Sequence, residues 1–440
     1  MKKLFLLVVS ILLCAVSVSA SSQSAVITLE FPGGAENTGL GECGVSHAKN
    51  IYTLFWNPAS LPAVYDETYS NIIFGHFHEV LLPLFQVPDL YHNFTPFCLL
   101  LNKVVPHIDI SYGCFENYIS FGTNDWTDIM GNVMDSAFSD ETVWAHTLAV
   151  RAFDIFSAGI TFKTYNSRLA PGYGIGDDGI ATGIAYDVGF RIGKKIPLFD
   201  IIELQPALGL SFLNLWGDSA KYIHDRTDTY EPIGKTIIYG GSMGFNVLDL
   251  FEYTYIREIS RSMLAGSWHE KTDHWGERFQ ITPFYCRIQG KMIDSVGNRH
   301  ERTQGDVVTL NFRKSLEMLE KVVRFSDRLN HTSYCQTLVS WDEEQAIGKY
   351  KIKPNFYFSF AHNSIETTGD NDSREGQSRF DWTLGIGILG NFPTYISNCK
   401  LLQTAPPRMT KEPIKTEKSD STRTLENHQK IKSHDEELFE

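Results

Sequence analysis

The feature that most constrains this chain is a strict alternation of side-chain type over long segments. Between Ile180 and Ile192, the even positions are large and apolar except for Thr182, whereas the odd positions are small, polar or charged. The same split recurs in residues 204–212, 237–247, 350–362 and 380–392. A period of two places the two kinds of side chain on opposite faces of a β-strand.

The length of these segments distinguishes a membrane-spanning β-sheet from the sheet of a soluble protein. Strands of soluble proteins are typically about 5–6 residues long, whereas a tilted membrane-spanning strand needs about 9–11. The alternating segments reach or exceed the longer value, and their second face is too small and polar for the inside of a sandwich. The pattern therefore predicts an all-β, antiparallel outer-membrane β-barrel whose apolar face meets lipid. A large secreted sandwich or propeller is the alternative.

Fourteen strands are predicted between residues 67 and 392, and an even number places both termini on the periplasmic side. The expected strands are Tyr69–Phe77, Asn93–Asn102, His107–Phe115, Val143–Arg151, Ile155–Tyr165, Ile180–Ile192, Ile202–Leu215, Lys235–Val247, Leu250–Ile259, Phe279–Gln289, Asp306–Phe312, Tyr334–Trp341, Tyr350–His362 and Phe380–Phe392. Residues 215–235 and 262–277 are expected to be polar loops, and Phe77–Leu90 a plug or rim segment. Helical spacing of apolar residues predicts an amphipathic helix over Asn311–Leu329, packed on the rim.

The two ends of the chain have distinct compositions. Residues 1–20 combine Lys2 and Lys3, an apolar run and a small-residue site at Ala20, which predicts a cleaved secretory signal peptide. Its removal takes away two positive charges and no acid, so the formal charge changes from −13 to −15. This charge argues against nucleic acid as a partner. Residues 393–440 are rich in charged residues, Ser, Thr and Pro, which predicts a disordered tail.

Residues 21–66 precede the strands, and within them Pro32–Pro62 is rich in glycine. Gly39, Gly41 and Gly44 permit positive φ and close backbone approach. Asn57 and Pro58 form a turn signal. The stretch is therefore interpreted as a compact, irregular plug.

Several short motifs resemble catalytic or metal sites without the required context. Residues 174–179 match GxGxxG but precede a strand, and 240–244 match GxSxG within a strand, where Ser242 lacks the elbow of a hydrolase. His269 and His274 are five residues apart rather than four, His76 and His78 are a lone pair, and residues 370–375 carry Arg374 where a calcium loop needs Asp or Asn. We therefore expect no catalytic residue, metal or cofactor.

Six cysteines remain after signal removal, and none has CxxC spacing. An exported chain can form disulfides, but single buried thiols are at least as compatible with this pattern. Pairing is left open for Cys43, Cys98, Cys114, Cys286, Cys335 and Cys399.

The plug stretch also resembles a known family. Residues 35–45 (AENTGLGECGV) and the later Trp56-Asn57-Pro58-Ala59 resemble the N-terminal signature of FadL-type outer-membrane proteins, which include long-chain fatty acid transporters and PorV-type secretion components. The resemblance implies a fourteen-stranded barrel with an N-terminal hatch in its lumen. The hatch or gating residues that it implies are Gly39, Gly41, Gly44, Trp56, Asn57 and Pro58.

These observations lead to three functional hypotheses. The first is passive uptake of hydrophobic small molecules such as long-chain fatty acids, through a barrel surrounded by outer-membrane lipid. The second is a PorV-like barrel that does not transport but docks a protein partner through its loops or tail. The third, least favoured, is a lumenal lipid hydrolase around Ser242.

Overall fold

The computed structural model describes the barrel and the segment before it. The described residues are 24–81, 89–128, 130–169, 179–199, 201–217, 219–222, 229–263, 271–294, 300–330, 345–347, 350–352, 355–367 and 377–387. The predicted signal peptide, most of the GxGxxG turn, the expected strand Tyr334–Trp341, the acidic loop 370–375 and the predicted tail lie outside them. Among the described residues, no helix is both long enough and apolar enough to span a membrane.

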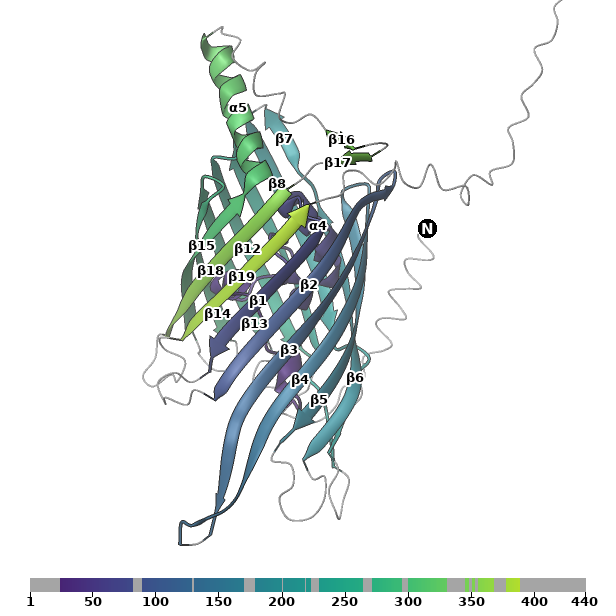
Figure 1. Cartoon of the computed structure of the whole chain (residues 1–440), viewed down its shortest axis with the longest axis vertical. Helices are drawn as coiled ribbons and strands as arrows, with labels where there is room; N and C mark the ends of the chain where they lie inside the picture. Colours follow the sequence, from purple (N-terminus) through teal and green to yellow (C-terminus); the bar gives the residue numbers. More distant parts are fainter. Residues whose placement is uncertain are drawn as a thin grey trace, which may run out of the picture. The chain divides into compact units, whose positions relative to one another are not determined.

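Fourteen antiparallel strands form a closed ring (Figure 1), as the sequence predicted. They are β1 (Ile72–Val80), β2 (Leu90–Val105), β3 (Ile108–Thr127), β4 (Val133–Ala152), β5 (Phe156–Arg168), β6 (Ile180–Gly193), β8 (Ile202–Leu213), β11 (Thr236–Val247), β12 (Phe251–Ser262), β13 (Lys271–Ile281), β14 (Tyr285–Asp294), β15 (His300–Asn311), β18 (Asn355–Thr367) and β19 (Ser378–Gly387). β1 pairs with β19, with Ile72 opposite Ile386. Each strand of the ring therefore has a neighbour on both sides, which leaves no free sheet edge.

Among the described residues, five short strands lie outside the ring. β7 (Ile196–Phe199) pairs along the first residues of β8. Two small hairpins are β9 (Ala220–Tyr222) with β10 (Thr229–Glu231), and β16 (Gln345–Ile347) with β17 (Tyr350–Ile352).

The alternation in the sequence becomes the two faces of the wall. On β5, Phe156, Ile160 and Phe162 are exposed on the outer face, whereas Ser157 and Thr161 between them are fully buried inside. β19 repeats this order, because Phe380 and Ile386 point outward while Asp381 and Thr383 are buried. The prediction that the apolar face lies outward and the small, polar face inward is confirmed.

Several predicted boundaries are wrong. β13 begins within the expected loop 262–277, and the expected strand Phe279–Gln289 runs across the turn between β13 and β14. Lys271 to Glu277 alternate charged and aromatic outward residues with polar inward ones, so hydropathy gave no strand signal there. The start of Phe77–Leu90 continues β1 rather than forming a plug. The predicted total of fourteen was correct although one strand was missed and one proposed strand, Tyr334–Trp341, lies outside the described residues.

The two ends of the barrel differ in their connections. At one end the strands are joined by short turns at residues 106–107, 153–155, 248–250 and 282–284. We call this the turn end; β1 starts there and β19 finishes there. The connections at the opposite loop end are generally longer, such as residues 169–179 and 214–235.

The predicted amphipathic helix is present as α5 (Phe312–Asn330), which follows β15 at the turn end (Figure 1). The hydroxyl of Tyr69 donates a hydrogen bond to Glu317 at 2.7 Å, and the Arg313 guanidinium lies 4.6 Å from the centre of the Tyr69 ring. The first turns of α5 therefore pack on the rim.

Residues 24–71 lie inside the ring of strands (Figure 1). We call them the N-terminal segment. They form short helices joined by tight turns: η1 (Ile27–Leu29), α2 (Ala35–Gly39), α3 (Thr53–Trp56), η2 (Pro58–Ser60) and α4 (Leu61–Thr68). Nearly all their side chains are buried, and the segment occupies much of the interior of the barrel.

Pairs of glycines in the wall receive the backbone of this segment. Gly276 of β13 lies opposite Gly290 of β14, and the backbone of Leu40 and Gly41 packs directly on both. A Cβ atom at Gly290 would lie 1.9 Å from the nitrogen of Gly41. Gly41 itself has a φ of 70°, which favours glycine.

A second glycine pair lies on another part of the wall. Gly159 of β5 is opposite Gly189 of β6, and both contact the turn from Asn57 to Ala59. A Cβ atom at Gly159 would lie 2.6 Å from the carbonyl carbon of Pro58. The small inward face of the wall is thus the surface on which the segment docks.

Replacing Gly290 with alanine should loosen the N-terminal segment, since the new methyl group would overlap the backbone of Gly41. Overpacking of this kind costs about 1–3 kcal/mol. We expect a lower thermal unfolding temperature and faster tryptic cleavage at Lys49. The control is Gly241→Ala on β11, where the nearest atom is the end of the flexible Leu208 side chain at 3.0 Å. Equal effects of the two variants would contradict glycine-mediated docking.

Candidate functional site

The residues predicted as a hatch meet the wall at two separate places. Gly39 ends α2 and Gly41 follows it, and these two contact β13, β14 and β18, while Gly44 packs against the ring of Trp56. Asn57 donates hydrogen bonds from Nδ2 to the carbonyls of Val45 at 2.9 Å and Phe190 at 3.1 Å. Its Oδ1 accepts one from the N–H of Ala59 at 3.0 Å.

Asn57 therefore connects two turns of the segment to strand β6. These hydrogen bonds hold the segment in one position.

Wall side chains that sequence reasoning missed bind the segment backbone. The carboxylate of Glu258 on β12 accepts hydrogen bonds from the N–H groups of Gly44, Val45 and Ser46, at 2.9, 3.0 and 2.8 Å. Asp381 on β19 accepts one from the N–H of Ala35 at 2.6 Å. These buried carboxylates supply partners for backbone groups that no regular ladder satisfies.

His274 links the segment to the wall in the same way. Its Nδ1 lies 2.8 Å from the carbonyl oxygen of Gly41, and its Nε2 lies 2.9 Å from Oγ of Ser260. A carbonyl oxygen can only accept, so Nδ1 carries the hydrogen, and in the neutral ring Nε2 accepts from the Ser260 hydroxyl. In the sequence, His274 was noted only as part of a zinc-site motif whose histidine spacing is wrong.

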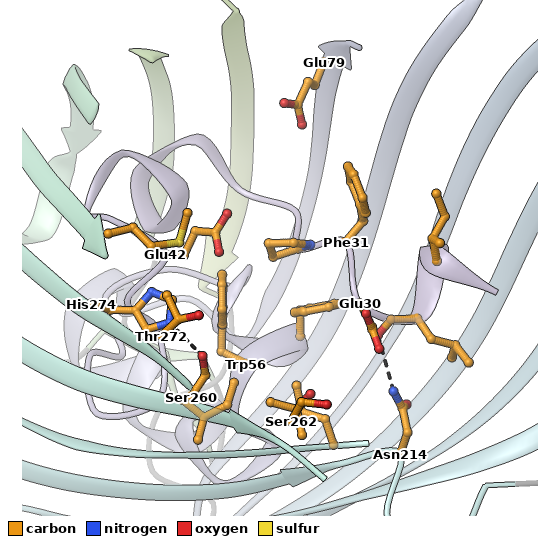
Figure 2. Close-up of a pocket in the computed structure, with 18 of the residues that line it drawn as sticks. Glu30, Phe31, Glu42, Trp56, Glu79, Asn214, Ser260, Ser262, Thr272 and His274 are labelled. Carbon is orange, nitrogen blue, oxygen red and sulfur yellow. Dashed lines mark hydrogen bonds between the residues drawn. The ribbon is translucent and has the colours of Figure 1, made fainter. Parts of the chain in front are cut away.

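A cavity of about 360 Å³ lies between the N-terminal segment and the strands, toward the loop end (Figure 2). Apolar side chains contribute much of its lining, from the segment (Phe31, Phe55 and Trp56) and from the wall (Leu213, Ile238 and Met292). Trp56, a predicted hatch residue, lies between the cavity and Gly44. The segment therefore forms one side of the cavity.

Polar groups in the lining are largely paired with one another. Arg379 lies 2.6 Å from Glu79, and Ser260 is bonded to His274. Thr236 and Thr272 add hydroxyl groups, and Glu42 is half-buried at the edge. The cavity thus combines an apolar surface with a few oriented polar groups, a combination that is common in small-molecule sites.

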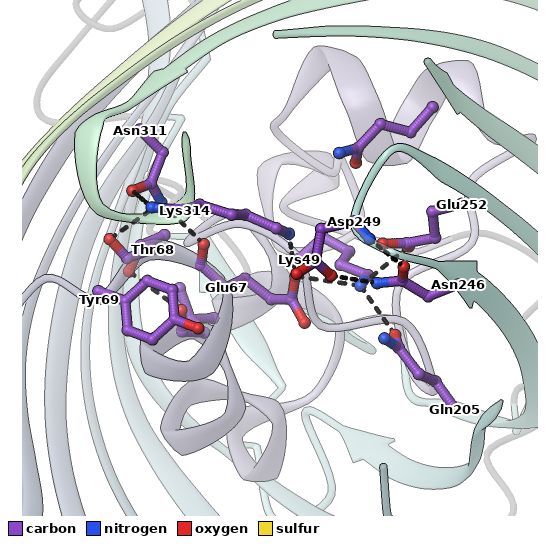
Figure 3. A network of polar contacts seen from close by, with 12 residues as sticks. Lys49, Glu67, Thr68, Tyr69, Gln205, Asn246, Asp249, Glu252, Asn311 and Lys314 are labelled. Carbon is purple, nitrogen blue, oxygen red and sulfur yellow. Dashed lines mark hydrogen bonds and ion pairs between the residues drawn. The ribbon is translucent and has the colours of Figure 1, made fainter. Parts of the chain in front are cut away.

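On the turn side of the segment, a network of ion pairs replaces the apolar lining (Figure 3). Glu67 at the end of α4 lies 3.0 Å from Lys49, 3.2 Å from Lys195 and 3.2 Å from Lys314 of α5. Lys49 also lies 2.9 Å from Glu252 of β12. One carboxylate therefore ties two parts of the segment to α5 and to the strand connection at Lys195.

Glu36 of α2 extends this network toward β13. It lies 2.8 Å from Arg278, which is 3.3 Å from Glu252, and it accepts a hydrogen bond from Asn50 at 2.8 Å. Lys49, Glu252, Arg278 and Glu36 thus form a continuous chain of alternating charges through the interior.

These partners shift the pKa values of both carboxyl groups. Burial alone would raise the pKa of Glu67, but the charges of Lys195, Lys49 and Lys314 lower it well below its usual range. Burial also acts to raise the pKa of Glu36, and the Arg278 guanidinium together with His47 lowers it well below the usual range. Both groups are therefore carboxylates at neutral pH.

Two of the short motifs that resemble catalytic or metal sites lie in regular strands of the barrel. Ser242 lies inside β11 with paired residues on both sides, so no strand-to-helix elbow exists there. His76 and His78 lie on the outer face of β1, where their Nδ1 atoms contact Thr95 at 3.1 Å and Asn93 at 2.8 Å.

The described part of the chain contains no metal-binding cluster and no disulfide. No cluster of three or more metal-binding side chains occurs among the described residues. Cys43, Cys98, Cys114 and Cys286 are free thiols. Cys335 and Cys399 lie outside the described residues.

Comparisons with known proteins give structural likeness without sequence kinship. The sequence matches no protein-family model and none of the curated proteins. The chain is similar to the CymD monoaromatic hydrocarbon channel, with 9% identity, 84% of this chain and 100% of that chain covered, and a TM-score of 0.38.

Two toluene transporters show a comparable likeness. For TodX of Pseudomonas putida the values are 10% identity, 82% and 98% coverage, and a TM-score of 0.39. For TbuX of Ralstonia pickettii they are 10%, 82% and 99%, and 0.36. Identities and TM-scores this low carry nothing over to the present chain.

Acid should weaken the attachment of the N-terminal segment. A carboxyl group whose pKa is lowered by folding stabilises the protein above its unfolded value of about 4.3, and this stabilisation is lost as pH falls through and below that value. We expect the thermal unfolding temperature to drop between about pH 5 and pH 3. In Glu36→Gln plus Glu67→Gln it should be lower at pH 7 and less dependent on pH.

Glu277→Gln serves as the control, because Glu277 lies on the outer face of β13, where it accepts a hydrogen bond from Gln289, and is not part of the network of Glu36 and Glu67. It should retain the pH dependence of the wild type. An unchanged pH profile in the double variant would show that these two carboxylates do not anchor the segment.

Proposed function

We propose that the protein is an outer-membrane channel for passive uptake of hydrophobic small molecules such as long-chain fatty acids. The observation that carries the proposal is the cavity of about 360 Å³ between the N-terminal segment and the wall. Its volume falls in the range of small-molecule sites, about 300–1,000 Å³, and apolar side chains from both segment and wall contribute to it.

The membrane placement follows from the wall. A closed ring pairs strand backbone groups internally, which the hydrocarbon core of a membrane requires. Large apolar side chains such as Phe156, Leu208 and Phe360 are exposed on the outer face. Membrane barrels have short periplasmic turns and longer external loops, so we assign the turn end to the periplasm. Both ends of the ring, at Ile72 and Gly387, lie on that side.

The N-terminal segment acts as the hatch in this proposal. A ligand entering from the loop end reaches Phe55 and Trp56, beyond which the segment fills the interior. Passage requires part of the segment to shift. Many of its contacts to the wall are hydrogen bonds and ion pairs, which water can replace during such a movement.

The second candidate is a PorV-like barrel that docks a protein partner without transport. The many polar contacts that fasten the segment favour a barrel that stays closed. The two experiments below separate these functions, because a barrel that stays closed carries no ligand flux.

Filling the cavity should block uptake. Ile238 of β11 lines the cavity, whereas its neighbour Ile237 lies on the opposite, outward face of the same strand. Ile238→Trp should lower the uptake of radiolabelled oleate severalfold in cells of a Gram-negative host that lacks its own fatty-acid channel. Ile237→Trp is the matched control and should leave uptake close to the wild type. Equal uptake by both variants at equal surface levels would argue against the cavity as the route.

Locking the segment to the wall should stop uptake reversibly. A Cβ atom at Gly39 would lie 3.0 Å from Cβ of Asn363, close to the separation of about 3.5–4.5 Å found in disulfides. Gly39→Cys plus Asn363→Cys should therefore lose oleate uptake on oxidation and regain it on reduction. The single-cysteine variants control for oxidation of native thiols. Equal uptake by the cross-linked and reduced protein would exclude movement of this part of the segment.

A further inference from the structure

The outer face of strands β12 to β15 differs from the rest of the wall toward the loop end. Four basic side chains lie there on outward positions: Arg257 and Arg261 of β12, Lys291 of β14 and Arg302 of β15. A basic side chain facing lipid costs about 2–4 kcal/mol at the membrane midplane and about 0–1 near its interfaces. The cluster therefore marks a level at which the wall does not meet acyl chains.

These four side chains have no carboxylate partner among the described residues. Neighbouring charges on the same face are paired, since Arg287 lies 3.1 Å from Asp306 and Lys271 lies 3.2 Å from Asp273. Arg257 instead lies over the ring of Trp275, with its guanidinium carbon 5.4 Å from the ring centre. The unpaired positive charges are available to an anion from outside the chain.

The outer wall is hollowed within this cluster. A depression of about 530 Å³ is lined by Lys291, Arg302, Trp275 and Tyr255, and reaches the backbone at Gly290. Glu277 also lines it, and its carboxylate accepts a hydrogen bond from Gln289. Two cationic groups and two aromatic rings thus border one concave site.

On β12 and β13, the surface next to the depression toward the turn end is apolar. Tyr253 and Phe279 are exposed there on the outward face, whereas the adjoining part of β14 and β15 carries the Arg287–Asp306 ion pair. Trp and Tyr are enriched where the wall of a membrane barrel passes from acyl chains to headgroups. The depression lies at such a boundary, with charge on one side and hydrocarbon-like surface on the other.

We propose that this depression binds the phosphate group of an anionic membrane lipid. Lys291 and Arg302 hold the phosphate, Arg257 and Arg261 add positive potential, and the acyl chains lie along Tyr253 and Phe279. Arginine suits this role because its planar guanidinium can bind phosphate oxygens in pairs. The site uses the membrane placement proposed above but is independent of transport.

Lipid binding can be measured on the full-length barrel in neutral detergent by native mass spectrometry. The probes are phosphatidylglycerol, phosphatidylcholine and inorganic phosphate. We expect tighter binding of phosphatidylglycerol than of phosphatidylcholine. Lys291→Gln plus Arg302→Gln should weaken phosphatidylglycerol binding about 30-fold, because each basic residue near a membrane surface contributes about fivefold.

The matched control is Arg168→Gln plus Lys321→Gln, which removes one arginine and one lysine that already pair with Asp140 and Asp249, away from the depression. This control should bind phosphatidylglycerol like the wild type, with both double variants checked for folding by heat-modifiable migration. Equal affinity of the wild type for the two lipids would overturn the site and leave the basic face to a protein partner. Equal affinity for inorganic phosphate and for phosphatidylglycerol would overturn the assignment to a lipid.

Discussion

The structure depends on the contact between the backbone of the N-terminal segment and glycines of the wall. At Gly276 with Gly290, and again at Gly159 with Gly189, two strands expose bare backbone side by side. Leu40–Gly41 and Asn57–Ala59 fill these positions. The close approach brings segment N–H and C=O groups within reach of Glu258, Asp381 and His274. The polar contacts between the segment and the wall therefore depend on this close packing of backbone on glycine.

The segment divides the interior into two environments. Toward the loop end, Phe55 and Trp56 face a cavity with few unpaired charges. Toward the turn end, Glu67, Lys49 and Glu36 belong to a continuous ion network. A hydrophobic solute meets a favourable surface on the first side and a costly one on the second, because it cannot pair with buried charges. The loop side of the segment therefore suits a hydrophobic solute, whereas the turn side does not.

The sequence predicted the architecture because alternation is a local signal. The outward side chains of β5 and β19 recur every second residue, as Ile160 and Phe162 do, so this signal needs no knowledge of the neighbouring strands. β13 was missed because its outward positions carry Lys271, Asp273 and Glu277, which reverse the expected polarity. The glycines of the N-terminal segment were noted in the sequence, but the wall glycines Gly276 and Gly290 that the segment contacts were not. A glycine pair in the wall forms only when the register of two strands places the two glycines opposite each other. A single segment of sequence does not show that register. Glu258 and His274 were missed for the same reason.

The contacts of Tyr52 have a consequence for the junction between the first and last strands. β1 and β19 complete the ring, and Tyr52 reaches both sides of this seam. Its hydroxyl donates to the carbonyl of Trp382 on β19 at 2.9 Å, and its ring lies 6.0 Å from that of Phe94 on β2. The N-terminal segment that fills the barrel therefore also contacts the wall on both sides of the junction between β1 and β19. In the hatch movement proposed above, a displacement that keeps this contact would leave Tyr52 in place and shift the turns on either side of it rather than expel the whole segment.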